Sequence, residues 1–422
     1  MQLEAGTTYF TICARNYLAY ALTLRDSLLA VDPAADFIVF IADAPLDGSV
    51  PDNVEIIPVE RLSCSELNAM AFRYTLMEFS TAIKPWCFEY LLDNLGYERA
   101  IYLDPDIFVY RPLEKVDDAF DDGASVVLTP HLLTPLEDDF SPGDRDILRS
   151  GTFNLGFAGF AKTAEAAAFL KWWKTQLTNH CLVDFPNGLF VDQKFVEFAP
   201  SFIDRLTVLR HPGYNVAYWN LANREVAELK NGWTVNGEPL VFFHFSGVIP
   251  DDGTVFSKYQ DRFSIDNIGV VRRMLDDYLA QLQKNGHAHW TKLPYAYDFF
   301  HDGSRIYPPM RRQSGLTGSP EDWFRKADIA YWSAMSDRVD QTDDCVISRL
   351  MIAIYDTRPD LQQSFPLSHR DGRLAYRDWF LLHAQREYGF QNSDFANFTK
   401  GQKPRSLARL RRLSTRLLGR FQ

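Results

Sequence analysis

Residues 99–110 read R-A-I-Y-L-D-P-D-I-F-V-Y, an apolar run that ends in two carboxylates separated by a proline. The segment Ala100–Leu103 has the length and the β-branched or aromatic content of a buried strand. Asp104 and Asp106 are two positions apart, so in an extended segment their side chains point the same way and can converge on one ion. Pro105 fixes the backbone between them and stiffens the pair.

Two carboxylates at the carboxyl end of a buried strand are hard oxygen ligands that suit Mg²⁺ or Mn²⁺, and they leave positions for diphosphate oxygens. Ligands bind at the same edge in open α/β sheets. A plain turn is the competing interpretation of a single D-x-D motif. The chain has a second such motif at Asp144 and Asp146, and because no strand precedes it we interpret that pair as part of a solvated loop.

Strands alternate with helices around the first D-x-D motif, which predicts an α/β fold with a mainly parallel sheet and helices on both faces. Apolar runs predict strands at residues 9–13, 37–42, 54–59, 100–103, 125–128, 153–160 and 240–243. Helical spacing predicts helices at residues 17–31, 63–79, 85–95, 164–179 and 192–198. The acidic, proline-containing stretch Thr129 to Ser150 reads as a long functional loop.

Beyond about residue 255 the pattern becomes mostly helical. We expect helices at residues 268–284, 320–335, 345–355 and 374–388. The sequence therefore predicts two domains, residues 1–262 with the α/β pattern and residues 263–422 as a helical C-terminal extension.

Composition favours a soluble globular protein, with 46% hydrophobic and 23% charged residues. The net charge is −11, yet residues 400–422 hold eight basic and no acidic side chains, so the rest carries 36 basic and 55 acidic ones, a net −19. An acidic body disfavours nucleic acid as a partner. Five cysteines without a C-x-x-C motif predict a reducing compartment. Without a signal-peptide pattern or a long apolar run, we expect a cytoplasmic protein.

Two further segments offer a cation and an imidazole. Lys84, in A-I-K-P-W, precedes the central strand and could bring positive charge to an anionic substrate, although a solvated lysine at a helix end is the plainer interpretation. His244, in F-F-H-F-S-G, follows an apolar strand as Asp104 does. His244 could be a metal ligand or a histidine buried in the core.

Two other motifs offer polar groups at the ends of predicted elements. In F-N-L-G-F, the amide of Asn154 beside the bare backbone of Gly156 could grip sugar hydroxyls, or the pair could be a sheet residue next to a bulge. In F-V-D-Q-K, Asp192 and Gln193 begin a predicted helix, where Asp192 could also be a simple cap.

The ordered set of motifs, T-I-C-A-R-N-Y-L-A-Y, A-I-K-P-W, D-P-D, F-N-L-G, V-D-Q and H-F-S-G, resembles the family 8 glycosyltransferases and related bacterial surface-polysaccharide glycosyltransferases of the GT-A fold. The resemblance covers roughly residues 7–262 and implies a Rossmann-like nucleotide-sugar and metal-binding catalytic domain. It implies the following roles: Asp104, Asp106 and His244 as metal ligands, Asp104 also on the nucleotide, Lys84, Asn154 and Gly156 near the donor, Asp192 and Gln193 beside the reacting sugar.

The same resemblance implies a retaining transferase that uses Mn²⁺ (or Mg²⁺) and a nucleoside-diphosphate sugar, with a UDP-sugar as the working assumption. The implied acceptor is a glycan or lipid-linked glycan. One departure concerns the lysine that the family places soon after the histidine in G-x-x-K-P-W. Here no lysine follows Gly247 until Lys258, to which we assign the contact with the donor diphosphate.

Three alternatives remain at this stage. An aspartyl-phosphate phosphatase also carries D-x-D after a buried strand, but its motif continues to Thr or Val where this chain has Phe108. A nucleotidyltransferase has similar metal and nucleotide needs, although no glycine-rich basic phosphate loop occurs near Tyr9 to Tyr17. A non-catalytic sugar-nucleotide-binding protein would keep the strands and lose the ligands.

The C-terminal tail, residues 404–422, predicts an amphipathic helix with leucines on one face and arginines around the other. It could dock on the acidic body, or it could bind the inner face of a membrane as a reversible anchor. We also expect residues 129–150 and the helical extension to shape the acceptor side.

Overall fold

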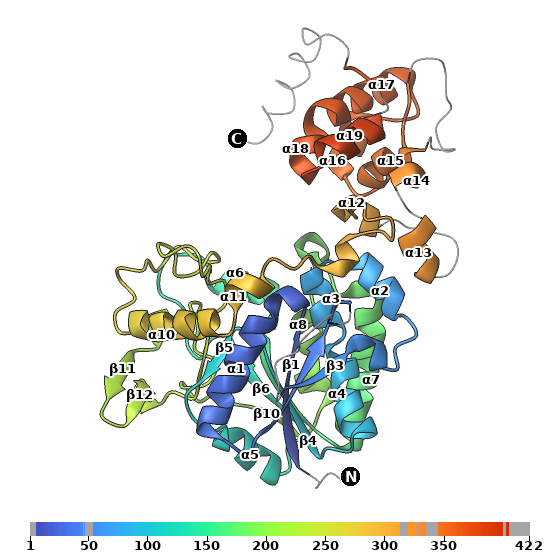
Figure 1. Cartoon of the computed structure of the whole chain (residues 1–422). Coiled ribbons are helices and arrows are strands. Elements are labelled where there is room, and N and C mark those ends of the chain that lie inside the picture. Colours follow the sequence, from blue (N-terminus) through green and yellow to red (C-terminus); the bar gives the residue numbers. More distant parts are fainter. Residues whose placement is uncertain are drawn as a thin grey trace. The chain divides into compact units, whose positions relative to one another are not determined.

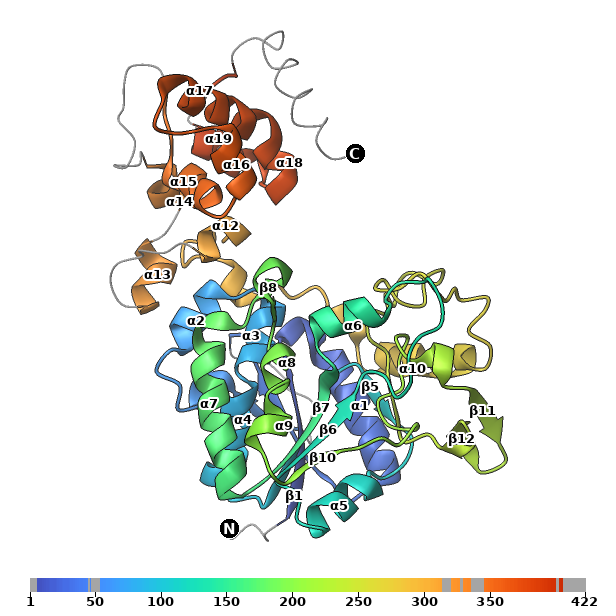
Figure 2. The same cartoon turned by 180° about the vertical axis from the view of Figure 1, so that it is seen from behind.

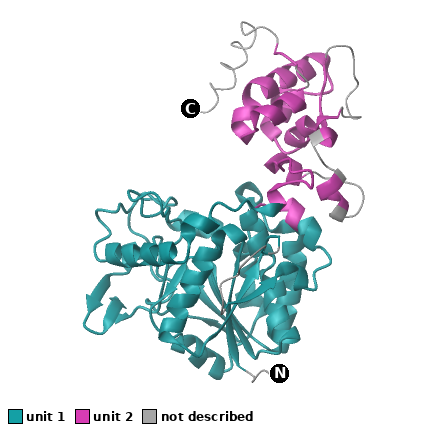
Figure 3. Cartoon of the chain, in the orientation of Figure 1, with its two compact units in different colours: residues 1–70, 76–296 teal, residues 71–75, 297–422 magenta. Residues whose placement is uncertain are grey.

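The computed structural model describes residues 6–44, 46, 54–312, 320–326, 329–334, 345–399 and 402–404. The chain forms two compact units, residues 1–70 with 76–296, and residues 71–75 with 297–422 (Figure 3). The first unit extends beyond the predicted boundary at residue 262. The reason is that α10 (Val271–Lys284) buries its apolar side, including Met274 and Tyr278, in one core cluster with Ala19 and Tyr20 of the α1 region.

Within the described residues the first unit is built on a seven-stranded sheet of order β10-β6-β7-β4-β1-β2-β3 (Figures 1 and 2). The strands are β1 (Thr7–Cys13), β2 (Asp36–Ile41), β3 (Glu55–Pro58), β4 (Arg99–Leu103), β6 (Val126–Pro130), β7 (Phe153–Ala161) and β10 (Leu206–Val208). All neighbours pair in parallel except β7, which is antiparallel to β4 and β6. The carboxyl ends of the parallel strands therefore share one edge of the sheet.

Helices cover both faces of this sheet. The α-helices among the described residues up to residue 296 are α1 (Leu18–Val31), α2 (Leu67–Arg73), α3 (Leu76–Ala82), α4 (Lys84–Glu89), α5 (Glu114–Asp121), α6 (Asp144–Ser150), α7 (Ala164–His180), α8 (Gln193–Val196), α9 (Ala199–Phe202), α10 and α11 (His287–Trp290). Helices α1 and α5 lie on one face, and α4 and α7 lie on the other (Figures 1 and 2). The predicted α/β architecture is confirmed.

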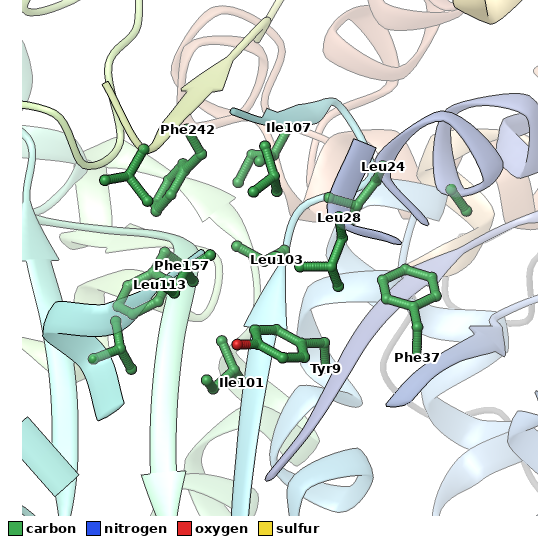
Figure 4. Close-up of a cluster of buried hydrophobic side chains, with 14 of the residues drawn as sticks. Tyr9, Leu24, Leu28, Phe37, Ile101, Leu103, Ile107, Leu113, Phe157 and Phe242 are labelled. Carbon is green, nitrogen blue, oxygen red and sulfur yellow. The ribbon is translucent and has the colours of Figure 1, made fainter. Parts of the chain in front are cut away.

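The side-chain alternation of the strands explains how one sheet supports two cores. Tyr9, Ile101 and Leu103 point toward α1, where they pack with Leu24 and Leu28 (Figure 4). The next residues along the strands point the other way. Phe10 packs edge-on against Phe88 of α4, and Phe160 of β7 stacks on Trp173 of α7.

Smaller strands complete the first unit: β5 (Ile107–Val109) with β14 (Phe242–His244), β8 (Val183–Asp184) with β9 (Leu189–Phe190), and β11 (Val226–Leu229), β12 (Gly232–Val235) and β13 (Glu238–Pro239). The sequence did not predict β5, β8, β9 or the β11–β13 sheet. These strands are two to four residues long, too short for an alternation pattern to be recognised.

The described part of the second unit is helical, as predicted. Its helices are α12 (Pro308–Arg311), α13 (Pro320–Lys326), α14 (Ile329–Ser333), α15 (Arg349–Asp356), α16 (Pro359–Ser364), α17 (Arg370–Trp379), α18 (Gln385–Tyr388) and α19 (Asn392–Thr399). Buried Trp332, Tyr376 and Phe380 form part of its core. Residues 405–422, which hold most of the predicted amphipathic tail, lie outside the described residues. No helix among the described residues is long and apolar enough to cross a membrane.

Two predictions that concern helices were wrong. The single helix expected at residues 63–79 is two helices, α2 and α3, separated by residues 74 and 75. Asp144 and Asp146 lie in the first turn of α6 rather than in a loop, and the Asp146 carboxylate accepts a hydrogen bond from the N–H of Gly143 (3.1 Å). Acidic side chains in a first helical turn accept hydrogen bonds from free N–H groups and interact favourably with the helix dipole. Asp144 and Asp146 therefore indicated the start of a helix, and the D-x-D pattern obscured this.

Candidate metal centre

Asp104 and Asp106 flank a tight turn at the carboxyl end of β4. The N–H of Ile107 donates to the carbonyl of Asp104 (3.0 Å), which closes the turn and starts β5. The N–H of Asp104 donates to the carbonyl of Gly156 on β7 (2.7 Å), so the pair is anchored to the sheet. The predicted extended D-P-D segment is therefore a turn, and the two carboxylates still converge.

His244 reaches these carboxylates because β14 pairs antiparallel with β5, in a register that places His244 opposite Ile107. The Nε2 atom of His244 lies 3.0 Å from Asp106 Oδ1 and 3.6 Å from Asp104 Oδ2. The sequence predicted a strand at residues 240–243 with His244 after it. In the structure His244 is instead the last residue of β14. His244 is 3% exposed, so its imidazole is buried.

The three side chains offer ligand atoms that all lie within 4.8 Å of one another, a group able to hold a metal ion. Two carboxylates and one imidazole suit a divalent first-row or alkaline-earth cation with open positions for substrate oxygens. The other ring nitrogen of His244, Nδ1, lies 3.3 Å from the amide oxygen of Asn215, the kind of outer contact that orients metal-binding histidines. The residues present therefore fit a divalent metal ion.

The charges of the site support the same interpretation. Burial raises the pKa of Asp104, while Lys84 and His244 act in the opposite direction. Burial works against a charged His244, but Asp106 and then Asp104 outweigh it and raise the pKa of His244. The two carboxylates that draw positive charge toward the imidazole would attract a metal cation in the same way.

Lys84 and Asp192 form a buried ion pair below the D-x-D turn. The ammonium of Lys84, at the start of α4, lies 2.6 Å from Asp192 Oδ2, and the two side chains are 1% and 2% exposed. The ammonium also donates to the carbonyl of Leu155 (2.9 Å) and lies 4.2 Å from the centre of the Tyr102 ring. The Tyr102 hydroxyl in turn donates to Asp104 Oδ1 (2.5 Å), which links the pair to the metal centre.

The contacts of Lys84 and Asp192 exclude the plainer roles that the sequence allowed for them. Lys84 is not a solvated lysine at a helix end, and Asp192 stands at the N-cap of α8 but its side chain makes no capping hydrogen bond. Burial raises the pKa of Asp192, and the Lys84 ammonium opposes that rise. The role predicted for each beside a donor stays a prediction.

Gln193 and its surroundings are held by the end of α6. The side-chain amide of Gln193 donates to the carbonyl of Ser150 (2.8 Å), and Gln193 is 7% exposed. Val191, two residues earlier, has a φ of 42°, a conformation that a β-branched residue rarely adopts. Strain of this kind occurs where surrounding structure over-determines a position, and here it aims the Asp192–Gln193 segment.

Gly156 lies against the candidate metal centre, and Asn154 is hydrogen-bonded to Gly156. Asn154 is buried, and its amide oxygen accepts a hydrogen bond from the N–H of Gly156 (3.0 Å). A Cβ atom on Gly156 would lie 2.5 Å from Cε1 of His244, closer than any real contact. The bare backbone of Gly156 is therefore needed to seat the His244 ring.

Lys258 lies beside the H-F-S-G segment that carries His244. Its N–H donates to the carbonyl of Gly247 (3.0 Å), and its ammonium lies 5.0 Å from the centre of the Tyr259 ring. Gly247 has a φ of 75°, and a Cβ there would lie 2.5 Å from Ser257 Oγ, so this turn requires glycine. The assignment of Lys258 to a donor diphosphate stays a prediction.

Sequence reasoning missed three residues around the site. Tyr102 could have been found, because it is two positions before Asp104 on a strand and so shares its side. Asn215 and His131 come from segments with no strand or helix pattern, and only the folded chain brings them to Asn154 and His244.

No family model matches the chain. Two curated relatives come from Bacillus subtilis (strain 168), and both are named as uncharacterized proteins. YfnF is 25% identical over 250 residues, which are 57% of this chain and 81% of YfnF. YfnD is 27% identical over 199 residues, which are 46% of this chain and 62% of YfnD. The match to YfnD thus spans less than two thirds of that relative.

Solved structures similar to this chain include a galactosyltransferase, LgtC, in complex with donor and acceptor sugar analogues. It has a TM-score of 0.42 and 13% identity, and the match covers 66% of this chain and 95% of that one. Another is a glycosyltransferase involved in glycosylation of the major capsid of PBCV-1, with a TM-score of 0.35, 14% identity and coverage of 58% and 94%. The glycosyltransferase GlyE of Streptococcus pneumoniae TIGR4 has a TM-score of 0.38, 13% identity and coverage of 70% and 67%.

Proposed function

We propose that the first unit is a metal-dependent glycosyltransferase of the GT-A type that uses a nucleoside-diphosphate sugar as donor. The observation that carries the proposal is the convergence of Asp104, Asp106 and His244 at the carboxyl edge of a mainly parallel sheet. Ligands bind at this edge in open α/β sheets. The ordered motifs of the sequence, which resemble family 8 glycosyltransferases, support the same choice.

The chemistry follows from the needs of glycosyl transfer. A divalent cation, bound when the donor is present, would neutralise charge on the leaving diphosphate. Asp104, Asp106 and His244 would hold it, and we assign Mn²⁺ (or Mg²⁺) to the site. Lys258 would place a second positive charge near the diphosphate.

Asp192 and Gln193 would lie beside the reacting sugar, on the side of Asn154. Developing positive charge at the anomeric carbon is stabilised by nearby carbonyl and carboxylate oxygens. Asp192 is buried against Lys84, so its charge is already balanced and its position is fixed. We propose a retaining transfer from a UDP-sugar because the family resemblance implies both.

The acceptor side is assigned to the 132–143 segment and α6. The Arg262 guanidinium makes two hydrogen bonds to the Asp138 carboxylate (2.8 and 2.7 Å), which ties this segment to the region after Lys258. Exposed Phe140 and Leu148 border it and suit the apolar faces of sugar rings. We propose a glycan or lipid-linked glycan as acceptor, in synthesis of a bacterial surface polysaccharide.

The predicted tail would bring the enzyme to a lipid-linked acceptor on the inner leaflet. Its basic residues would each contribute about 1 kcal/mol near anionic lipid. Sedimentation with anionic liposomes at low salt tests this. The full chain should pellet, and a chain ending at Thr399 should stay in the supernatant. If the two chains behave alike, the tail is not a membrane anchor.

The test of the function is a screen of the purified protein with Mn²⁺ against a panel of sugar nucleotides, read by thermal stabilisation and by donor hydrolysis. We expect one donor class to stabilise the protein and to be hydrolysed slowly. Asp106→Ala should lose hydrolysis without loss of the apo melting temperature. Stabilisation with no turnover under any condition would favour a non-catalytic binding protein, and release of phosphate from a phosphorylated substrate would favour the phosphatase.

A further inference from the structure

We propose that Asn215 is a positioning residue for metal binding. Its amide oxygen fixes a proton on Nδ1 of His244 and so directs the lone pair of Nε2 toward Asp104 and Asp106. This inference rests on the proposed metal function of His244. It concerns a residue that lies outside every motif of the sequence and does not itself reach the candidate metal position.

A backbone N–H group fixes the orientation of the first side-chain amide. The N–H of Gly156 can only donate, and it lies 3.0 Å from Oδ1 of Asn154. That atom of Asn154 is therefore the carbonyl oxygen and not the amide nitrogen. The amide nitrogen of Asn154 then faces Nε2 of His131 at 3.1 Å and donates to it.

The orientation of Asn154 fixes that of Asn215. An amide group of Asn215 lies 2.9 Å from the Asn154 carbonyl oxygen, so it must be the NH₂ group of Asn215. The same NH₂ group donates to Thr129 Oγ1, also at 2.9 Å. Both of its hydrogens are thus used, and its carbonyl oxygen is left to face Nδ1 of His244 at 3.3 Å.

A carbonyl oxygen only accepts, so Nδ1 of His244 must carry hydrogen. The nitrogen that can offer a lone pair is then Nε2, the atom that lies 3.0 Å from Asp106. A ring with the other tautomer would turn a hydrogen toward the metal and could not bind it. The chain from Gly156 through Asn154 and Asn215 therefore selects the metal-binding form of His244.

Asn215 is held firmly enough to do this. It is fully buried and has a φ of 53°, a conformation that asparagine tolerates better than most residues. Its backbone carbonyl accepts a hydrogen bond from the side chain of Asn220 (3.0 Å), and the next residue, Val216, bridges to Phe243 of β14, beside His244. The strained backbone and the burial of the side chain indicate that the fold holds the Asn215 amide in one defined position.

The first test measures Mn²⁺ affinity by electron paramagnetic resonance in four variants of the full chain: Asn215→Gly, Asn236→Gly, His244→Gln and the double variant Asn215→Gly with His244→Gln. Asn215→Gly removes the amide and permits the positive φ. Asn236→Gly is the control, because Asn236 also has a positive φ (52°) and its side chain also makes hydrogen bonds, one with Glu225 and one with Asn223. We expect Asn215→Gly to raise the Kd for Mn²⁺ about 10- to 100-fold and Asn236→Gly to leave it unchanged.

The double variant shows whether Asn215 affects metal binding through His244 or through a general change in packing. In a His244→Gln background, Asn215→Gly should have no further effect on the Kd, because the group through which it acts is gone. An equal effect in both backgrounds, or an unchanged Kd in the single variant, would overturn the proposal.

The second test needs no metal and so separates this inference from the proposed function. In protein labelled with ¹⁵N at histidine, with His244→Gln for assignment, a proton should be found on Nδ1 of His244 and should exchange slowly with water. Asn215→Gly should make that exchange fast. A His244 whose Nδ1 carries no proton would refute the role of Asn215 even if Mn²⁺ binds. A wild-type chain that binds no Mn²⁺ would refute the metal site even if Nδ1 is protonated.

Discussion

Gly156→Ala should damage the candidate metal centre although it replaces none of the candidate ligands. The added methyl group would lie 2.5 Å from Cε1 and 2.7 Å from Nδ1 of His244, and 2.7 Å from Oδ1 of Asn154. Carbon atoms in contact prefer separations of about 3.5–4.0 Å, so the imidazole must move by roughly 1 Å. Metal–ligand distances tolerate only about 0.2 Å, so His244 would leave the position from which it can bind.

The expected size of the effect has two parts. Overpacking of this kind costs about 1–3 kcal/mol of unfolding free energy. Loss of a correctly placed histidine should raise the Kd for Mn²⁺ by about 10- to 100-fold, the cost usual for disturbing the groups around a metal. The two are measured by urea unfolding of the metal-free protein and by a Mn²⁺ titration.

Gly159→Ala is the matched control, since Gly159 lies on the same strand and its added Cβ would meet Phe120 of α5 at 2.9 Å. This variant should lose stability in the same range and keep its Mn²⁺ affinity. The reasoning is refuted if Gly156→Ala binds Mn²⁺ like the wild type, or if Gly159→Ala loses affinity to the same extent.

Three further variants test neighbouring parts of the account. Lys84→Met should cost about 3–5 kcal/mol in urea unfolding because it strands the buried Asp192 carboxylate, and a second change, Asp192→Asn, should restore part of the loss. Burial lowers the pKa of His131 from 6.5 to about 4, so the unfolded chain takes up a proton that the folded chain refuses as pH falls from 6.5 to 4. Over that range His131→Gln should therefore lose about 3 kcal/mol less unfolding free energy than the wild type loses. Equal pH profiles of the two proteins would contradict this. Arg262→Met, which frees Asp138, should lower transfer to acceptor several-fold and spare donor hydrolysis, whereas equal loss of both would remove the acceptor role.

The sequence predicted the sheet and the Asp104–Asp106 pair because both rest on local patterns. Buried strands alternate with amphipathic helices, and Asp104 and Asp106 follow such a strand directly. His244 could be matched to them only through the order of motifs, since its contact depends on the pairing of β14 with β5 across more than 130 residues of chain.

The parts that the sequence could not predict depend on contacts between distant segments. The burial of Lys84 against Asp192 brings together α4 and the start of α8, and no property of A-I-K-P-W distinguishes a buried lysine from an exposed one. Asn215 comes from a segment without periodicity, so propensity gives it no role. Asp144 and Asp146 were assigned to a loop because their value as first-turn residues of α6 competes with their value as loop formers.

The central claim is that Asp104, Asp106 and His244 bind a divalent ion that in turn binds a nucleoside diphosphate. Calorimetric titration of UDP into the wild-type protein and into Asp106→Ala, each with and without Mn²⁺, tests it most directly. We expect tight binding of UDP only where Mn²⁺ and Asp106 are both present. Equal binding of UDP without Mn²⁺, or by Asp106→Ala, would contradict it.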